Sequence, residues 1–262
     1  MENEADAIRL VNNAVTWETG ISTEWETHVH LAALYRLVAL QGWDDLIFTH
    51  ISARVPGPEH HFLINPFGLF YEEITASSLV KIDLDGKVIG QATVPINAAG
   101  FNIHAAIHAA REDARFVLHL HSDHGVAVAA QSEGLLPLTQ NALRVMPFLA
   151  YHDYEGIALN VDERVRLVSD LGTRTLLLLR NHGTLSMGQT AAEAWLGIYF
   201  LERACRQQVM ALSAGRAGVL LAPDAAQRTS REQAISLFPR FAERAWPGLL
   251  RMVERRSPGY DT

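Results

Sequence analysis

Cysteine is almost absent from this chain, whose 262 residues include only one, Cys205. Because a disulfide needs two cysteines, the sequence excludes an internal disulfide and any fold that depends on one. Cys205 stands in a segment of helical character, where we expect a buried structural thiol rather than a nucleophile.

Long apolar runs and an excess of positive charge are missing as well. The longest hydrophobic runs, such as residues 175–179, are far shorter than the roughly 20 residues that cross a bilayer. The acidic start, MENEAD, lacks the basic and apolar regions of a signal peptide. A net charge of -7 offers no basic footprint for nucleic acid. We therefore expect a cytoplasmic protein with a small-molecule substrate, which binds neither a membrane nor nucleic acid.

Apolar residues make up 48% of the chain and charged residues 19%, enough for a sizeable core in one domain. Helices are expected over residues 23–42, 97–111, 160–171, 190–214 and 231–244, and strands over 47–54, 61–64, 80–83, 115–121, 148–152 and 174–179. This alternation predicts an α/β fold of three layers, with helices on both faces of a mixed sheet. We divide the chain into an N-terminal extension (1–22), one domain (23–244) and a C-terminal tail (245–262).

Local signals mark several of these boundaries. Thr23 is a suitable N-cap for the first helix, whose buried side should include Trp25 and Leu34. Asn160 and Glu163 have the spacing of a capping box at the start of a later helix.

Two histidines two residues apart end an apolar, strand-like run, Arg115-Phe-Val-Leu-His-Leu-His-Ser122. Side chains at this spacing on a strand point to the same face, so His119 and His121 can bind one metal ion together. His182 follows a second apolar run, and three imidazoles from two strand ends would make an open-sided metal site. A His-x-His pair is more often a packing or surface feature, so these residues alone leave both interpretations open.

Several short strings, in their order and spacing, resemble the class II aldolase/adducin family over roughly residues 25 to 215. They are THISAR (49–54), FLINPFGLF (62–70), NAAGFNIH (97–104), HLH (119–121), RNHG (180–183), AEA (192–194) and LER (201–203). The resemblance implies a three-layer α/β/α sandwich around a mixed, largely antiparallel sheet. It also implies a homo-oligomer, usually a tetramer, with its active site at a subunit contact.

The resemblance further implies a divalent metal ion held by His119, His121 and His182, most often zinc, with manganese, iron or cobalt as alternatives. Enzymes of this family break carbon–carbon bonds through a metal-stabilised enolate. The physical reason is that a Lewis acid on a carbonyl oxygen stabilises the negative charge that appears there as the bond breaks.

The chain departs from the sugar-phosphate aldolases at two places. The resemblance implies that those enzymes share a glutamate that acts as the acid or base at the reacting carbon. By its spacing to His104, the matching position in this chain is Gly100. Their phosphate-binding loops, Gly-Asn-x-Ser and Ser-Gly, are replaced by Thr49-His-Ile-Ser52 and Phe67-Gly68. Loss of a small, amide-rich anion site argues against a phosphorylated substrate. We therefore expect decarboxylation, or aldol-type cleavage, of an unphosphorylated keto, hydroxy or aromatic carboxylic acid.

Candidate substrate-binding residues alternate along one strand. Arg54 can receive a carboxylate through two hydrogen bonds, although an arginine at a strand end is as often a surface charge, and His50 and Ser52 alternate with it. His104 is not expected to bind the metal itself, but it is a candidate for orienting one of the histidines that do.

Decarboxylation needs an acid to protonate the carbanion. His124, one helical turn from the metal pair and matched by a histidine in the aldolases, and Tyr151 are our candidates, with His152 and Tyr154 as alternatives. A structural role is the ordinary one for buried histidine and tyrosine.

Two other functions stay open. Some members of the family resemble iron(II)-dependent oxygenases, and three histidines cannot select the metal. Adducin heads are non-catalytic scaffold or oligomerisation modules of the same fold, and the stretch from Gly100 to His104 is closer to them than to the aldolases. Against this, all three ligand positions are histidine, and no long basic tail of the adducin kind follows the domain.

Overall fold

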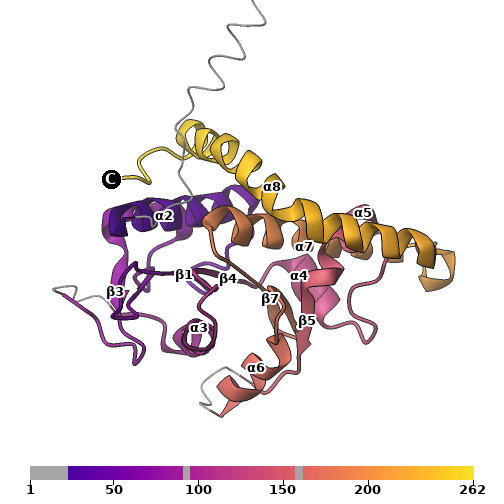
Figure 1. Ribbon diagram of the computed structural model, residues 1–262, viewed down its shortest axis with the longest axis horizontal. Helices are drawn as coiled ribbons and strands as arrows, with labels where there is room; N and C mark the ends of the chain where they lie inside the picture. The colour runs from indigo at the N-terminus through magenta and orange to yellow at the C-terminus, as the bar shows by residue number, and fades with distance from the viewer. Residues whose placement is uncertain (1–22, 91–94, 157–161) are drawn as a thin grey trace, which may run out of the picture.

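A seven-stranded sheet forms the middle of the protein in a computed structural model that describes residues 23–90, 95–156 and 162–262 (Figure 1). The strand order is β3-β2-β1-β4-β7-β6-β5. The strands are β1 (His50–Arg54), β2 (Phe62–Ile64), β3 (Val80–Ile82), β4 (Phe116–Leu120), β5 (Leu149–His152), β6 (Leu176–Leu179) and β7 (Gly183–Gly188). All neighbouring strands are antiparallel except β5 and β6, which are parallel. This confirms the mixed, largely antiparallel sheet.

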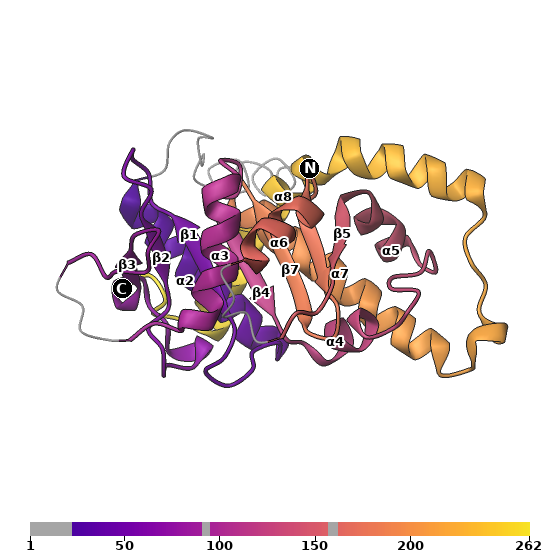
Figure 2. The ribbon, with the colours of Figure 1, turned by 90° about the horizontal axis from the view of Figure 1, so that it is seen from below.

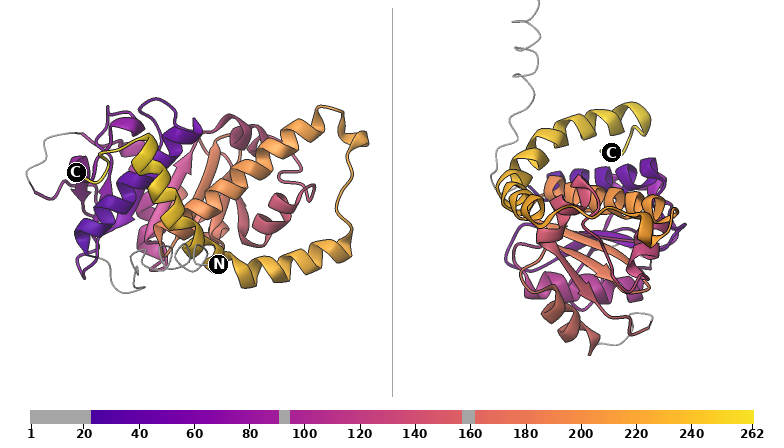
Figure 3. Two further views of the ribbon diagram at one scale, coloured as in Figure 1. Left: turned by 90° about the horizontal axis from the view of Figure 1, so that it is seen from above. Right: turned by 90° about the vertical axis from the view of Figure 1, so that its right-hand side faces the viewer.

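Helices cover both faces of the sheet, as the alternation of elements predicts. On one face lie α2 (Glu24–Gln41), α4 (Asp123–Ala129), α5 (Gln140–Val145) and α7 (Ala191–Leu212), with α8 (Asp224–Arg256) across them. The other face carries α3 (Ala98–Ala110) and α6 (Glu163–Leu171), which Figure 2 shows in front of the strands. Short 3-10 helices are η1 (Tyr71–Glu73), η2 (Ala76–Ser78), η3 (Met146–Phe148) and η4 (Arg216–Gly218). The three-layer α/β/α sandwich is therefore confirmed (Figure 3).

Helix α2 begins and ends where the sequence predicts. The Thr23 hydroxyl accepts a hydrogen bond from the Glu26 N–H, and the Glu26 carboxylate accepts one from the Thr23 N–H. The helix stops at Gly42, whose φ of 66° suits glycine. However, residues 31–38 are all buried, because the sheet lies beneath α2 and α8 lies above it. Trp25, expected on the buried side, is 51% exposed in the first turn.

Strand β7 lies inside the sheet, between β4 and β6, although no strand was predicted after His182. Its sequence, GTLSMG, is polar and glycine-rich, which hides a central strand. The buried Ser186 hydroxyl donates a hydrogen bond to the Ala194 carbonyl in α7, at 2.8 Å. Gly188 is needed for close packing, since an added Cβ there would lie 2.6 Å from the Ala194 nitrogen.

The last helix is longer than predicted at both ends. The sequence analysis expected it over residues 231–244, but α8 extends from Asp224 to Arg256 and contains Pro239 and Pro247. Packing of Trp246 and Val253 into the main core stabilises the part beyond residue 244. The division of the chain at residue 244 stays a prediction, but the helix does not end there.

The start of α6 differs from the predicted capping box. Asn160 of the expected capping box lies outside the described residues, and α6 follows Asp162, whose side chain makes no capping hydrogen bond. Across the described ranges, no helix combines the length and apolar character that a membrane span requires.

Candidate metal centre

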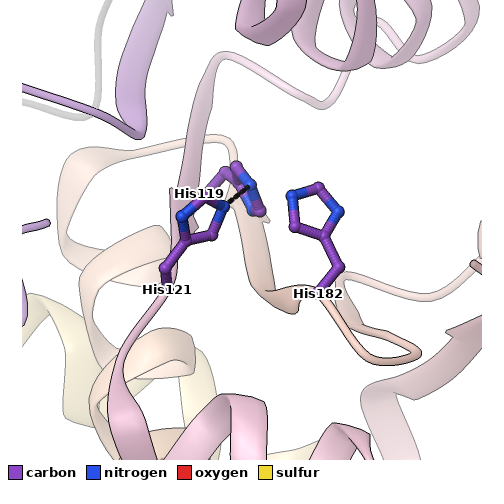
Figure 4. A group of neighbouring side chains, drawn as sticks. All are labelled: His119, His121 and His182. Atoms are coloured by element: carbon purple, nitrogen blue, oxygen red, sulfur yellow. Dashed lines mark hydrogen bonds between the residues drawn. The ribbon is translucent and has the colours of Figure 1, made fainter. Parts of the chain in front are cut away.

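Three histidine side chains converge at the end of the two central strands. His119 and His121 come from the end of β4, and His182 comes from the turn between β6 and β7 (Figure 4). One nitrogen from each ring can be chosen so that all three lie within 4.8 Å of one another. The ring centre of His182 lies 4.7 Å from that of His119 and 4.9 Å from that of His121. The predicted grouping of these three residues is therefore present in the fold.

Hydrogen bonds behind two of the rings decide which nitrogen faces the group. His119 Nδ1 donates to the Thr184 carbonyl at 3.1 Å, and His121 Nδ1 lies 3.0 Å from the Asp45 carboxylate, which accepts its proton. A neutral imidazole with its proton on Nδ1 has a lone pair on Nε2. Both Nε2 atoms are therefore able to bind a metal ion rather than to donate a hydrogen bond.

The two Nε2 atoms lie 3.1 Å apart. Facing lone pairs at this distance repel each other unless a proton or a metal ion lies between them. Ligands of a tetrahedral zinc ion, with bonds of about 2.0–2.1 Å, are about 3.3 Å apart. The chemistry and spacing of the donors therefore fit a divalent cation.

Burial keeps the rings in the state that a metal ligand requires. Burial lowers the pKa of His119 well below its usual value, and the neighbouring His182, His121 and His50 lower it further. The pKa of His182 falls to about 4, through burial and then through His121 and His152. Both rings are thus neutral at pH 7 and available to a cation.

The group is closed on one side and open on the other. His119 is 2% exposed, while the side chain of His121 is 28% exposed and that of His182 is half-buried. A metal held by three protein ligands at such a place keeps a position for water or substrate.

The turn that carries His182 depends on tight packing. Asn181 has a φ of 56°, a left-handed conformation that asparagine tolerates, and Gly183 follows His182 directly. A Cβ added at Gly183 would lie 2.3 Å from the Leu120 carbonyl oxygen, which is a clash. It would also lie 3.2 Å from the His121 ring and 3.3 Å from the His119 ring, which are tight contacts.

Gly183→Ala is therefore expected to weaken metal binding by at least about tenfold and to lower the free energy of unfolding by about 1–3 kcal/mol. Denaturant unfolding and a metal titration measure the two effects. Gly218→Ala is the control, because a Cβ there meets nothing within 4 Å. Equal behaviour of the two variants would contradict the packing argument.

His50 and His104 lie behind the metal ligands. His50 is paired with His119 across β1 and β4, and their ring centres are 5.7 Å apart. His104, on α3, has its ring centre 4.2 Å from that of His50, and both residues are 2% exposed. The structure thus brings His50 beside a ligand, whereas any effect of His104 on His119 by ring contact passes through His50.

A buried hydrogen-bonded chain extends from His104 away from the metal group. His108 Nδ1 donates to the Ala114 carbonyl at 2.7 Å, and burial lowers the pKa of His108 to about 3. Its Nε2 therefore accepts from the Ser52 hydroxyl at 2.7 Å, and Ser52 in turn accepts from His104 Nδ1 at 2.6 Å. Both hydrogen-bonding directions of Ser52 are occupied by histidines.

Arg54 lies at the other end of β1. Four residues of strand separate it from His50, or roughly 13 Å. Its guanidinium donates to the His108 carbonyl and lies 3.6 Å from the Glu112 carboxylate, and the residue is 8% exposed. The structure does not bring Arg54 or Ser52 together with the three ligand histidines, and it gives both of them structural partners. Their role as substrate-binding residues stays a prediction.

The candidate acids are also separated by the fold. The Tyr151 hydroxyl accepts the Leu135 N–H at 3.0 Å, and the Arg180 guanidinium lies 4.4 Å from its ring centre. Tyr151 packs on the α4/α5 side of β5, whereas the next side chain, His152, points to the opposite face. The Tyr151 hydroxyl oxygen thus has a backbone donor, and its role as an acid stays a prediction.

The other three candidates adjoin the three histidines along the chain or in space. His124 is half-buried in the first turn of α4, three residues after His121. The Tyr154 ring is 52% exposed and 6.3 Å from the His182 ring. His152 is buried and bonded through Nδ1 to Asp170 at 2.7 Å.

The sequence analysis missed two carboxylates that support the site. Asp45 holds His121, and Glu202 in α7 binds the hydroxyls of Ser122 and Thr184. Both are distant in the chain from their partners, so no local spacing could indicate them. The Leu201-Glu-Arg203 string was noted only as part of a resemblance.

Comparisons with known proteins identify relatives of the whole chain. A family model described as the class II aldolase and adducin N-terminal domain matches residues 29–209. A Caulobacter vibrioides protein named "Putative aldolase class 2 protein" is 68% identical over 237 residues, covering 90% of this chain and 92% of that protein. A crystal structure of an aldolase II superfamily protein from Pseudomonas syringae matches with a TM-score of 0.87 and 47% identity, covering 94% of this chain and 99% of that one.

Adducins are similar over a shorter range. Rattus norvegicus alpha-adducin is 46% identical over 186 residues, which is 70% of this chain but 25% of that protein.

Proposed function

The chain belongs to the class II aldolase and adducin family, and on this basis we propose that it is a divalent-metal-dependent lyase. The reaction is cleavage of a carbon–carbon bond, by decarboxylation or by aldol-type cleavage, in an unphosphorylated keto, hydroxy or aromatic carboxylic acid. The observation that carries the proposal is the pair of Nε2 atoms of His119 and His121, 3.1 Å apart with both Nδ1 protons engaged elsewhere.

A divalent cation bound there supplies a Lewis acid, which stabilises negative charge on a carbonyl oxygen of the substrate. The protein's own groups do the rest. Thr184 and Asp45 hold the tautomers of His119 and His121, and the open side of His121 and His182 admits the substrate. Cleavage leaves a carbanion that needs a proton. His124 and Tyr151 are the donors that we propose, and Tyr154 is an alternative because its ring centre lies 6.3 Å from that of His182.

Aromatic side chains near Asp45 support an unphosphorylated substrate. Phe48, whose N–H donates to the Asp45 carbonyl at 2.8 Å, is 46% exposed. Its ring centre lies 6.3 Å from that of Phe67. By the resemblance, Phe67 occupies the position of the serine in the Ser-Gly turn of the sugar-phosphate aldolases. Aromatic rings give a phosphate no hydrogen-bond donor, so binding one here would leave its charge poorly matched.

The test is turnover of a panel of keto, hydroxy and aromatic carboxylic acids by the zinc-, manganese- or cobalt-loaded protein without oxygen. We expect release of carbon dioxide or of a carbonyl fragment, and a kcat/KM at least about tenfold lower for phosphorylated analogues. A preference for the phosphorylated compounds would contradict the substrate class. Turnover that requires both iron and oxygen would instead support an oxygenase.

A scaffold function is the second candidate, and similarity to alpha-adducin favours it. Failure of the protein to bind any divalent ion, after reconstitution has been attempted, would support it over the lyase.

We propose a cytoplasmic homotetramer as the assembly. Large apolar side chains exposed near α8 support a subunit contact, among them Leu220 at 89% and Ile235 at 52% exposure. Light scattering in solution tests the number of subunits.

A further inference from the structure

A carboxylate lies buried beneath the metal group and is not explained by the proposed chemistry. Glu202, in the middle of α7, is 2% exposed. One of its oxygens accepts the hydroxyl hydrogen of Ser122, and the other accepts that of Thr184 at 2.5 Å. Both carboxylate oxygens are thus bonded to residues from other parts of the chain.

These two hydroxyls belong to the segments that carry the three histidines. Ser122 follows His121 directly, and its oxygen also accepts the Gly125 N–H at 3.1 Å, which caps α4. Thr184 lies two residues after His182, and its backbone carbonyl accepts the proton of His119 Nδ1. Glu202 therefore joins the β4–α4 junction to the turn between β6 and β7.

Space around the carboxylate is limited. A Cβ added at Gly125 would lie 2.6 Å from Thr184 Cγ2, 2.8 Å from Ser122 Oγ and 2.9 Å from a Glu202 carboxylate oxygen. The three groups therefore pack against the backbone of α4 and cannot move apart from it independently.

An acidic group at this place is costly for stability. Burial raises the pKa of Glu202, and among the described residues no lysine or arginine forms an ion pair with it. An apolar side chain of similar volume would be as good or better for folding. A role that needs two acceptor oxygens at once explains the carboxylate better than core packing does.

We propose that Glu202 is a positioning residue, which holds Ser122 and Thr184 so that His119, His121 and His182 converge on one cation. The inference rests on the proposed metal site and names a residue that acts on it from beneath. The hydrogen bonds of Glu202 go to Ser122 and Thr184 rather than to the three histidines, so its effect passes through the backbone of the two segments and the Thr184 carbonyl.

The test compares Glu202→Ala and Glu202→Gln with Gln208→Ala in the full-length protein. Gln208 is a matched control, because it is also buried on α7 and bonds to Leu136, Gln131 and Gly134, away from the metal group. Zinc affinity is measured by competition with a chromophoric chelator. Geometry of the site is followed by the visible absorption spectrum of the cobalt(II)-loaded protein, and folding by thermal unfolding.

We expect Glu202→Ala to weaken zinc binding by about 10- to 100-fold and to change the cobalt spectrum. Glu202→Gln keeps one acceptor oxygen and should lose less affinity, which also provides a folded variant if the alanine protein is unstable. Gln208→Ala should lower the unfolding temperature while zinc affinity and cobalt spectrum stay as in the wild type.

Two results would overturn the inference, and they are distinguishable. Wild-type zinc affinity and an unchanged cobalt spectrum in both Glu202 variants would leave the metal site standing and remove the positioning role. A wild-type protein that binds neither zinc nor cobalt would remove the metal site itself, and the inference with it.

Discussion

Replacing His121 with alanine should abolish metal binding and turnover together. Two imidazoles remain in the variant, His119 and His182, and two nitrogen ligands hold a divalent ion much more weakly than three. Elemental mass spectrometry of protein purified without chelator should show a near-stoichiometric ion in the wild type and almost none in the variant. Activity should fall to the uncatalysed background, because the Lewis acid is absent.

The matched control is His61→Ala, a half-buried histidine before β2 that lies outside the metal group. It should keep both the metal and the activity. A metal-free His121→Ala protein that still turned over its substrate would be decisive against the mechanism. The identity of the ion in the wild type is informative as well, since zinc, manganese or cobalt supports a lyase and iron supports the oxygenase.

Trp195→Ala should be the most damaging single change in the core. The side chain is 1% exposed and packs in a cluster with Trp43, whose ring centre is 5.8 Å away, and Tyr199, whose ring centre is 6.2 Å away. Removing the indole leaves a cavity between α7 and its neighbours that the packed rings cannot fill. We expect the free energy of unfolding to fall by about 3–5 kcal/mol, as measured by denaturant unfolding.

Trp25→Ala provides the comparison, because this residue is 51% exposed and, among the described residues, its ring stacks on His28, with ring centres 5.7 Å apart. Its loss should cost no more than about 1 kcal/mol. Similar losses in the two variants would show that burial does not decide the contribution of these two tryptophans.

Helix α2, which carries Trp25, shows how far the sequence predicts the fold. The caps at Thr23 and Gly42 are local signals, so the limits of α2 could be predicted. Which side of α2 is buried depends on α8, which crosses it from the far end of the chain. No helical periodicity within residues 23–42 contains that information.

Strand β7, an interior strand of the sheet, could not be predicted for a related reason. A strand such as β4 is apolar and buried along its length, so its sequence predicts it. Strand β7 satisfies Thr184 and Ser186 through α7 instead, so its polar residues suggest a loop. Long-range hydrogen bonds replace apolar character there, and a sequence window cannot include both partners.

The candidate site likewise contains residues that local patterns predict and residues that only long-range contacts reveal. His119 and His121 share a strand end, which is a local pattern, and the third histidine could be found from a second strand end. Asp45 could not be found, because its contact with His121 joins residues far apart in the chain. Arg54 shares a strand face with His50, but distance along the strand separates it from the metal group.

The position of the ligands on two neighbouring strands gives a bound ion a second effect. His119 and His182 are about 60 residues apart in the chain, and α4, α5, β5, α6 and β6 all lie between them. An ion bound by both would hold the two ends of this segment together in the folded protein, and because the site does not exist in the unfolded chain, its binding free energy would add to the free energy of unfolding. In a protein with a single cysteine, the cation would be the cross-link that no disulfide can provide.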